Sequence, residues 1–397
     1  MKETGIQWIG KIPDSWALDR LQWHMDEVKE SNDPVQTKQV LSLTNKLGVI
    51  PYEDKGEQGN KAKEKLNEYK LAYPNTIVAN SMNILIGSVG KCDYFGCVSP
   101  VYYVFKPKDN ENIDFLNYIF QSTQFQKELR KYSNGILEIR LRVSASDILK
   151  RQVAFPSLDI QNKIVAFLNK KTTEIDSLIG IENQQIDKLK DYKQAVIRDA
   201  VTKGLISNVP MKDSGNEWIG FIPTEWNVCR FKNVITIANG KEIEVDGGEI
   251  PVYGSGGIFK YTDRPLFTGS SLLLGRKGTI DKPMLVNGSF WTVDTMFYTS
   301  EIRNIDEKFL FYCAKTLINF DFYKSGSVLP SMTQTELNNI YITYPDIKTQ
   351  KEIALFLDNK CAEIDTLISI KQKKIDDLNE YKKSLIYEYV TGKKEVC

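Results

Sequence analysis

The sequence contains FPSLDIQNKIVAFLNKKTTEIDSLI at residues 155–179 and a second version of it, YPDIKTQKEIALFLDNKCAEIDTLI, at residues 344–368. Pro345 of the second copy corresponds to Pro156 of the first, and this pairing defines the offset of the helical repeat. In both copies apolar residues recur at steps of three and four, which predicts an amphipathic helix whose apolar face is suited to packing on another helix. The chain therefore has two long helices of one design, each following a segment of different sequence.

The simplest way to bury both apolar seams is an antiparallel pair of helices with a head at either end. Thr172-Thr173-Glu174 predicts a break and restart of the first helix, because a threonine followed by an acid caps a new helix. Gly204 is expected to end that helix. The seam residues that we expect to pack the helices together or to dock a partner are Ile164, Phe167, Leu168, Ile175, Leu178, Leu189, Ile353, Phe356, Leu357, Ile364, Leu367 and Leu378.

Each seam turns polar at its middle, with Glu182 and Gln185 in the first copy and Lys371 and Lys374 in the second. In an antiparallel pair centred there, Glu182 would face Lys374. We expect such a polar layer to determine the register of the helices at some cost in stability. A solvated helix face is the alternative interpretation.

A second repeat stands before each variable segment. QWIGKIPDSW (7–16) recurs as EWIGFIPTEW (217–226), with Trp226 at the position of Trp16. Behind each motif, strand-like runs alternate with turns rich in Gly, Pro and Asn, and short helices interrupt them. The predicted fold class is α+β, with two mostly β heads separated by a long antiparallel two-helix coiled coil in a pseudo-two-fold repeat. The predicted domains are head one (1–157), a first helical region (158–206), head two with a short linker at its start (207–345) and a second helical region (346–397).

The composition limits the function classes. The 397 residues carry 52 Lys and Arg against 51 Asp and Glu, so the net charge of +1 argues against binding nucleic acid with the whole surface but leaves local basic faces open. The only histidine is His24, which excludes most histidine-based catalysis. The N-terminus lacks the apolar region of a signal peptide, and no apolar run approaches the ~20 residues of a membrane span. Six scattered cysteines without CxxC spacing indicate reduced thiols in a cytosolic protein.

Basic residues gather in each head beside glycines and aromatic residues. Residues 127–151 carry seven basic side chains against three acids, and residues 260–282 carry five against two. GRKG (275–278) has a counterpart in GSVG (87–90), at almost the offset of the helical repeat. Glycine lets backbone N–H groups approach phosphate, and Arg and Lys contact phosphates and bases, although a hairpin turn with solvated charges is the alternative. The candidate DNA-binding residues are Ser88, Lys91, Lys131, Arg140, Arg142, Tyr253, Lys260, Arg264, Arg276 and Lys277.

The duplicated motifs resemble the specificity subunit of type I restriction–modification systems, the HsdS family. The W-I-G-x-I-P-x-x-W motif is similar to the signature of its target-recognition domains, and the helical repeat looks like its conserved regions. The helical resemblance is carried by Pro156, Gln161, Ile164, Phe167, Leu168, Glu174, Ile175 and Asp176, and in the second copy by Pro345, Gln350, Ile353, Phe356, Leu357, Glu363, Ile364 and Asp365.

The resemblance implies that each head recognises one half of a bipartite site in double-stranded DNA. It implies that the coiled coil sets the spacer and docks two modification subunits, which methylate adenine with S-adenosylmethionine, and that restriction subunits using ATP and Mg join them in a cytoplasmic bacterial defence system. This chain would then be non-catalytic and would bind no cofactor or metal itself. The sequence contains neither a GxxxxGK[ST] phosphate loop nor the NPPF or DPPY tetrad of adenine methyltransferases.

Two other function classes remain open at this point. The chain could be a scaffold or adaptor whose heads bind protein or glycan through Tyr253, Phe259, Tyr261 and Trp291, with the coiled coil as a spacer. It could also be an enzyme that uses a carboxylate pair such as Glu242 and Glu244, although alternating carboxylates more often line a solvated strand edge.

Overall fold

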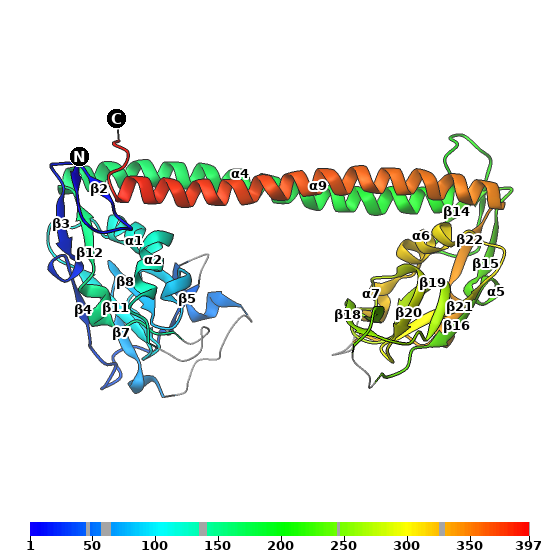
Figure 1. The fold of residues 1–397 in the computed structure, drawn as a ribbon, viewed down its shortest axis with the longest axis horizontal. Helices are drawn as coiled ribbons and strands as arrows, with labels where there is room; N and C mark the ends of the chain where they lie inside the picture. The colour runs from blue at the N-terminus through cyan, green and yellow to red at the C-terminus, as the bar shows by residue number, and fades with distance from the viewer. Residues whose placement is uncertain (45–47, 57–64, 135–140, 244–246, 325–329, 397) are drawn as a thin grey trace. The chain divides into compact units, whose positions relative to one another are not determined.

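The computed structural model describes residues 1–44, 48–56, 65–134, 141–243, 247–324 and 330–396. The chain divides into two compact units: unit 1 comprises Met1–Glu182 and Lys373–Cys397, and unit 2 comprises Asn183–Gln372. Two long helices, α4 (Leu158–Lys203) and α9 (Ile347–Val390), contribute residues to both units (Figure 1). Across the described ranges, no helix combines the length and apolar character needed to cross a membrane.

Unit 1 holds head one, whose main sheet has four antiparallel strands in the order β4–β11–β8–β9. These strands are β4 (Met25–Val28), β8 (Thr76–Asn80), β9 (Val89–Cys92) and β11 (Tyr102–Pro107). The two-stranded pairs are β1 (Lys2–Glu3) with β2 (Lys11–Ile12), β3 (Ala17–Arg20) with β12 (Gln152–Phe155), β5 (Leu41–Thr44) with β6 (Gly48–Pro51), and β7 (Lys70–Ala72) with β10 (Gly96–Val98). The helices are α1 (Ile113–Gln121), α2 (Thr123–Arg130) and α3 (Ala145–Leu149), with short 3₁₀ turns at Leu21–Trp23, Tyr52–Lys55, Leu66–Glu68 and Ile84–Ile86.

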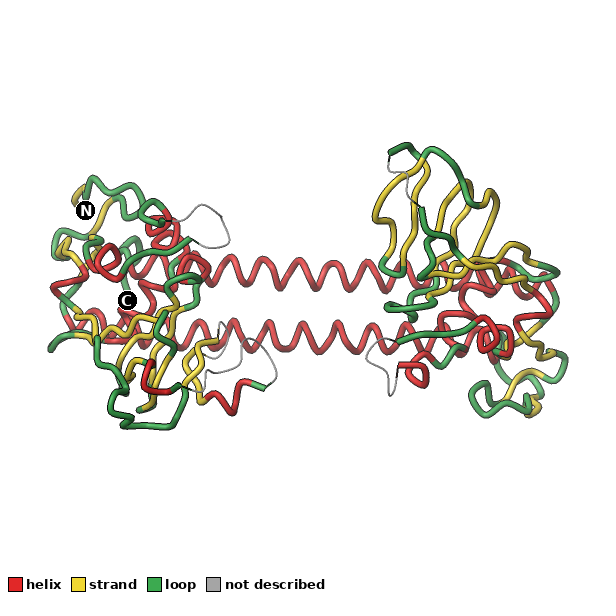
Figure 2. Tube along the Cα trace, turned by 90° about the horizontal axis from the view of Figure 1, so that it is seen from below, coloured by secondary structure: helices red, strands yellow, loops and turns green. Residues whose placement is uncertain are grey.

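Unit 2 holds head two, whose larger sheet has six strands in the order β16–β21–β19–β20–β17–β18. Its strands are β16 (Ile235–Asn239), β17 (Ile250–Gly254), β18 (Gly257–Thr262), β19 (Phe267–Gly275), β20 (Met284–Thr292) and β21 (Met296–Ile302), and only the β17–β20 pairing is parallel. Two pairs, β13 (Met211–Asp213) with β14 (Phe221–Pro223) and β15 (Asn227–Arg230) with β22 (Tyr341–Tyr344), lie outside it. The helices are α5 (Phe231–Val234), α6 (Glu307–Leu317), α7 (Phe320–Lys324) and α8 (Gln334–Asn339). Figure 2 draws the helices in red and the strands in yellow.

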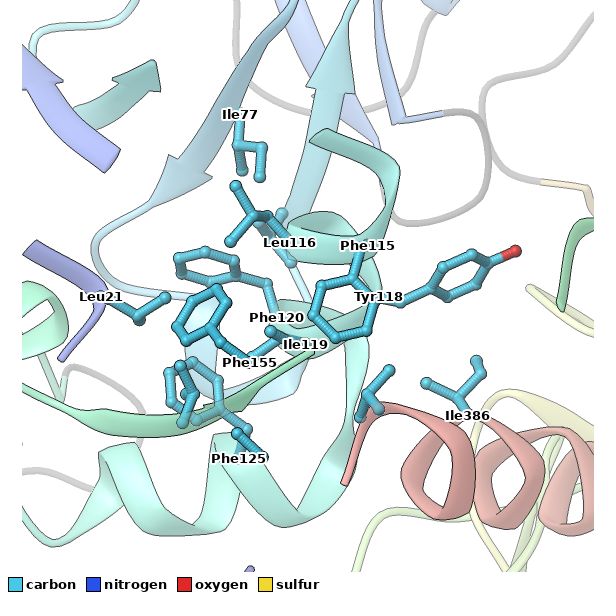
Figure 3. Packing of buried hydrophobic residues seen from close by; sticks show 14 of the residues in the cluster. Leu21, Ile77, Phe115, Leu116, Tyr118, Ile119, Phe120, Phe125, Phe155 and Ile386 are labelled. Atoms are coloured by element: carbon cyan, nitrogen blue, oxygen red, sulfur yellow. The ribbon is translucent and has the colours of Figure 1, made fainter. Parts of the chain in front are cut away.

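The hydrophobic core of unit 1 joins the head to both long helices. Phe115 and Phe120 of α1 are fully buried in one cluster with Ile386 of α9 (Figure 3). Leu168 of α4 belongs to the same cluster. Burying one such side chain contributes about 1.5–3 kcal/mol relative to leaving it in water. Unit 2 repeats the arrangement, with Leu357 of α9 in the cluster formed by α6 and the sheet. Each head therefore shares its core with the helices on which it rests.

The glutamine of the helical repeat connects the start of each long helix to its head. In unit 1 the side-chain oxygen of Gln161 accepts the N–H of Asn112 (2.9 Å), the N-cap of α1. In unit 2 that of Gln350 accepts the N–H of Asp306 (2.7 Å), the N-cap of α6. Both amide groups also donate to the carbonyl of the proline five residues earlier. This bonding explains the Pro and Gln spacing of both copies.

In both copies of the W-I-G-x-I-P-x-x-W motif, the second tryptophan contacts the end of a long helix. A Cβ on Gly392, after α9, would lie 2.5 Å from Pro13 and 3.3 Å from Trp16, and a Cβ on Gly204, after α4, would lie 3.1 Å from Trp226. Both glycines have positive φ, +66° and +78°, which L side chains rarely adopt. The predicted end of the first helix at Gly204 is confirmed, because α4 ends at Lys203.

The long helices are antiparallel within each unit. In unit 1, Lys382 contacts Asp176 (2.7 Å) and Lys374 contacts Glu182 (2.6 Å), so the residue number rises on one helix as it falls on the other. In unit 2, Lys193 contacts Asp365 (2.6 Å) and Lys371 donates to the side-chain oxygen of Gln185, which gives the same antiparallel sense. The predicted contact between Glu182 and Lys374 is confirmed.

The seam residues fall into three groups of different exposure. Ile164, Leu168, Ile175, Ile353, Leu357 and Ile364 are buried. Phe167, Leu189 and Leu378 are half-buried. Leu178, Phe356 and Leu367 are 45%, 40% and 48% exposed. The contact between helices is thus narrower than the sequence pattern, and part of the apolar stripe faces outward.

The predicted helix break at Thr172-Thr173-Glu174 is wrong, because α4 continues through these residues. Thr172 is buried, and its hydroxyl lies 3.3 Å from the carbonyl of Asn169 and 3.4 Å from the hydroxyl of Tyr118. The threonine hydroxyl is therefore satisfied within the helix and against the head, so it caps no new helix. The predicted α+β fold class, with β-rich heads and two long helices, is confirmed.

We expect a double-mutant cycle of Glu182→Ala and Lys374→Ala to give a coupling free energy of roughly 0.5–1 kcal/mol, because Glu182 is buried but Lys374 is solvated. Urea unfolding followed by circular dichroism would measure it. The more exposed pair Asp176 and Lys382 serves as the control, with a smaller coupling expected. Strictly additive effects at Glu182 and Lys374 would rule out a register-setting role for their contact.

Candidate nucleic-acid interface

In unit 2, Arg276 and Lys277 open the loop that follows β19. The N–H of Arg276 donates to the carbonyl of Thr295 (2.8 Å), and its guanidinium donates to the carbonyl of Asp294 (3.2 Å). The guanidinium also lies 6.0 Å from the ring centroid of Phe297. These contacts hold a half-buried cation at the start of the loop.

Two other segments meet that loop. Lys277 is exposed and forms a β-bridge with Ser331, and the N–H of Gly278 donates to the carbonyl of Pro330 (2.9 Å). A Cβ on Gly278 would lie 3.3 Å from the hydroxyl of Ser255, in the turn between β17 and β18. The GRKG segment is therefore a meeting point of loops rather than an isolated hairpin turn.

The remaining predicted residues of head two lie on or near β17 and β18. Tyr253 packs edge-on against Phe290 (6.2 Å between ring centroids), and its partial burial raises the pKa of its phenol. Lys260 donates to the carbonyl of Ile243 (3.0 Å), and Arg264 is exposed and lies 5.6 Å from the ring centroid of Trp291. Of the aromatic residues of the alternative ligand platform, Phe259 and Tyr261 are exposed, whereas Tyr253 and Trp291 are largely inside. Glu242 is exposed, and Glu244 lies outside the described residues.

In unit 1, Ser88 is buried and Lys91 is paired with carboxylates. Ser88 is buried, and its carbonyl accepts the N–H of Asn80 (3.0 Å). The ammonium group of Lys91 lies 3.3 Å from Asp114 and 3.7 Å from Asp93. Both residues therefore support the β8–β9 edge of head one.

The other cations of head one are more accessible. Lys131 is exposed and contacts Glu128 at 2.6 Å. Arg142 is exposed, and its Nη2 lies 3.6 Å from the sulfur of Met82. Within the described part of the chain, neither Arg142 nor Lys277 forms an ion pair. Arg140 lies outside the described residues.

The strand arrangement gives a different correspondence between the two heads from the predicted match of GSVG with GRKG. The loop between β8 and β9 occupies residues 81–88, and the loop between β19 and β20 occupies residues 276–283. GRKG therefore corresponds to the start of the first loop, at Ser81, whereas GSVG lies at the loop's end and in β9. Sequence comparison missed Ser81 and Met82, because no glycine or charge marks them, and it left Ser331 without a role.

Sequence profiles place most of the chain in one family. Residues 27–191 and 223–392 each match the profile described as the type I restriction modification DNA specificity domain. The MjaVIII type I restriction enzyme specificity subunit of Methanocaldococcus jannaschii is 27% identical over 283 residues, which cover 61% of this chain and 62% of that protein. The putative MjaX specificity subunit of the same organism is 22% identical over an alignment covering 97% of this chain and 95% of that protein.

Solved structures share the fold. A chain from a study of complex assembly and conformational transition in the type I R-M system aligns with a TM-score of 0.75 at 12% identity, covering 97% of this chain and all of that one. The HsdS subunit from Thermoanaerobacter tengcongensis aligns with a TM-score of 0.53 at 13% identity, covering 99% of this chain and all of that one.

Proposed function

Because the chain belongs to the type I restriction modification DNA specificity family, we propose that it is the non-catalytic subunit that directs a modification and restriction complex to a bipartite DNA sequence. Each head recognises one half-site, and the two long helices set the spacer between them. The observation that carries the proposal is the duplicated frame: the same Gln and Trp contacts hold two heads whose loop residues differ. A constant frame with variable loops suits the recognition of two unlike sequences.

DNA recognition is supported by the solvated cations of the heads. Arg142 in head one and Arg264, Arg276 and Lys277 in head two are at least partly exposed, and no carboxylate of the described residues neutralises Arg142 or Lys277. Lysine and arginine at such positions contact phosphates, and arginine also contacts base edges. The net charge of +1 fits binding through these local surfaces, because the rest of the chain then carries no excess of positive charge.

The outward apolar residues of the helices would dock two modification subunits. In unit 1 these are Leu178, Ile181 and Tyr381, and in unit 2 they are Leu367, Ile370 and Tyr192, which are their counterparts in the helical repeat. In unit 2 a pocket of about 290 Å³ also lies on the helix pair, lined by Leu189 and Leu367 with Gln185, Lys188 and Lys371. An apolar floor with a cationic rim fits an amphipathic helix with acidic flanks. A surface present twice fits two copies of one partner.

The chemistry would belong to the partners. The modification subunits would bind S-adenosylmethionine and methylate adenine, and the restriction subunits would use ATP and Mg, with no cofactor held by this chain. Because the complex would act on genomic DNA, it would function in the cytoplasm.

A mobility-shift assay of the chain with its modification subunits tests the proposal. We expect binding that depends on DNA sequence, and methylome sequencing of a host expressing the complex should report two half-sites with a constant gap. Binding indifferent to sequence would favour the scaffold function, for which the exposed Phe259 and Tyr261 would form the contact surface of head two.

We expect Lys277→Ala to weaken binding to all DNA sequences by a similar factor, because an exposed ammonium group contacts phosphate more readily than a particular base. The slope of log K against log salt should fall by about one. Lys232→Ala, at an exposed position of α5 in the same head, is the matched control and should leave the slope unchanged. An unchanged slope for Lys277→Ala would place this loop away from DNA.

A further inference from the structure

The two heads contain the same four-stranded arrangement although their sequences differ. Head one has the strand order β4–β11–β8–β9, and head two has β16–β21–β19–β20 within its larger sheet. In each, the third and fourth strands of that order are consecutive in the chain and antiparallel. The loops that join them, residues 81–88 and 276–283, are therefore equivalent.

The first residue of each loop makes the same backbone contact. The N–H of Ser81 donates to the carbonyl of Val101 (3.4 Å), and that of Arg276 donates to the carbonyl of Thr295 (2.8 Å). Each acceptor is the residue immediately before the neighbouring strand, β11 or β21. Arg276 of head two thus stands where head one has a buried serine.

A guanidinium nevertheless occupies the same neighbourhood in both heads. In head two, Arg276 lies near the ring of Phe297, the second residue of β21. The second residue of β11 is Tyr103, whose partial burial raises the pKa of its phenol. Arg142 also contacts Met82, the second residue of the loop. Both arginines therefore lie at the same loop, Arg276 as its first residue and Arg142 beside its second.

The two arginines come from different segments: Arg276 belongs to the loop, whereas Arg142 belongs to the segment that faces the loop. Arg142 precedes the buried Val143. The offset of the helical repeat makes Ser331, which precedes the buried Met332, the equivalent position in head two. Ser331 faces the loop through its bridge with Lys277. In head one the cation is on this opposite segment and the loop is neutral, whereas in head two the loop is cationic and the opposite segment carries serine.

We propose that one corner of each head contacts the bases: loop 81–88 with Arg142 in head one, and loop 276–283 with Ser331 in head two. Arg142 is the specificity-determining residue of head one, and Arg276 is that of head two. The inference rests on the proposed DNA-recognition function. A guanidinium donates two hydrogen bonds to O6 and N7 of guanine, and its orientation decides which base pair it reaches. Placing the guanidinium on opposite sides of one corner lets a duplicated scaffold recognise different half-sites.

The test uses the chain in complex with its modification subunits and a double-stranded DNA library with both half-sites randomised. We expect Arg142→Ser to reduce the base preference at one position of one half-site by about 5- to 150-fold and to leave the other half-site unchanged. Arg276→Ser should do the same in the other half-site only. Lys150→Ser, at an exposed position of head one, is the control and should change neither.

Two further variants separate base recognition from folding and from charge. Arg142→Lys keeps the charge but removes the planar fork, so it should lose the base preference while keeping non-specific binding. Adding Ser81→Arg to Arg142→Ser returns a guanidinium from the side used in head two, and it should restore a preference in that half-site. Circular dichroism of each variant checks that the heads remain folded.

Two results would overturn the inference: unchanged preferences in both half-sites for Arg142→Ser and Arg276→Ser, or a uniform loss on all sequences. If the unaltered complex selects no bipartite sequence, the proposed function itself fails. If it selects one and the serine variants select the same one, only the role of this corner fails.

Discussion

Replacing Leu168 by alanine is expected to lower the free energy of unfolding by about 2–5 kcal/mol. Leu168 is fully buried on α4, in the cluster that contains the aromatic residues of α1 and the end of α9. The truncation would leave a cavity among elements that are held by one another, so the surroundings cannot collapse around it. Leu357→Ala, at the equivalent buried position of α9, should have an effect of the same size in unit 2.

Urea unfolding followed by far-ultraviolet circular dichroism measures both effects. Leu178→Ala is the matched control, because it removes the same atoms from the same helix at a position that is 45% exposed, and it should change stability by no more than about 0.5 kcal/mol. An effect of Leu178→Ala as large as that of Leu168→Ala would mean that the buried face of α4 is wrongly assigned. The result matters for domain design, because head one cannot be separated at residue 157 without exposing this shared core.

Replacing Leu178 and Ile181 together by glutamate is expected to prevent one of the two modification subunits from binding. Both side chains are about half exposed and lie three residues apart, on one face of α4. Apolar anchors at the centre of an interface contribute about 2 kcal/mol or more each, and a buried charge adds a desolvation cost. Native mass spectrometry should therefore detect one modification subunit per chain instead of two.

The duplicated surface provides two controls for this experiment. Leu367→Glu with Ile370→Glu changes the equivalent residues of unit 2, and it should likewise leave one modification subunit bound. Thr173→Glu adds a negative charge at an exposed polar position of α4 that is neither three nor four residues from Leu178 or Ile181, and the complex should keep both subunits. Retention of two subunits by the Leu178 and Ile181 variant would move the docking surface away from this face.

The helical frame could be predicted in detail because its signals are local and repeated. Apolar residues at steps of three and four mark the helices, and one constant offset pairs their copies from Pro156 and Pro345 onward. Two equivalent antiparallel helices that cross a two-fold axis at the polar layer can pair in only one register. That register predicts the contact between Glu182 and Lys374. The helix break failed because Thr172 has a tertiary partner in Tyr118, which no local pattern reveals.

The heads were less predictable because their contacts are distant in sequence. Similar spacing suggested that GSVG matches GRKG, but strand pairing makes Ser81 the equivalent of Arg276 and buries Ser88. A one-residue step along a strand reverses the direction of its side chains, so a sequence offset cannot say which cation is solvated. The sequence alone determined the two-fold repeat and the helix register, since both depend on periodicity along the chain. Only the tertiary structure placed Arg142 beside loop 81–88, because long-range strand pairing decides which distant segments meet at one corner.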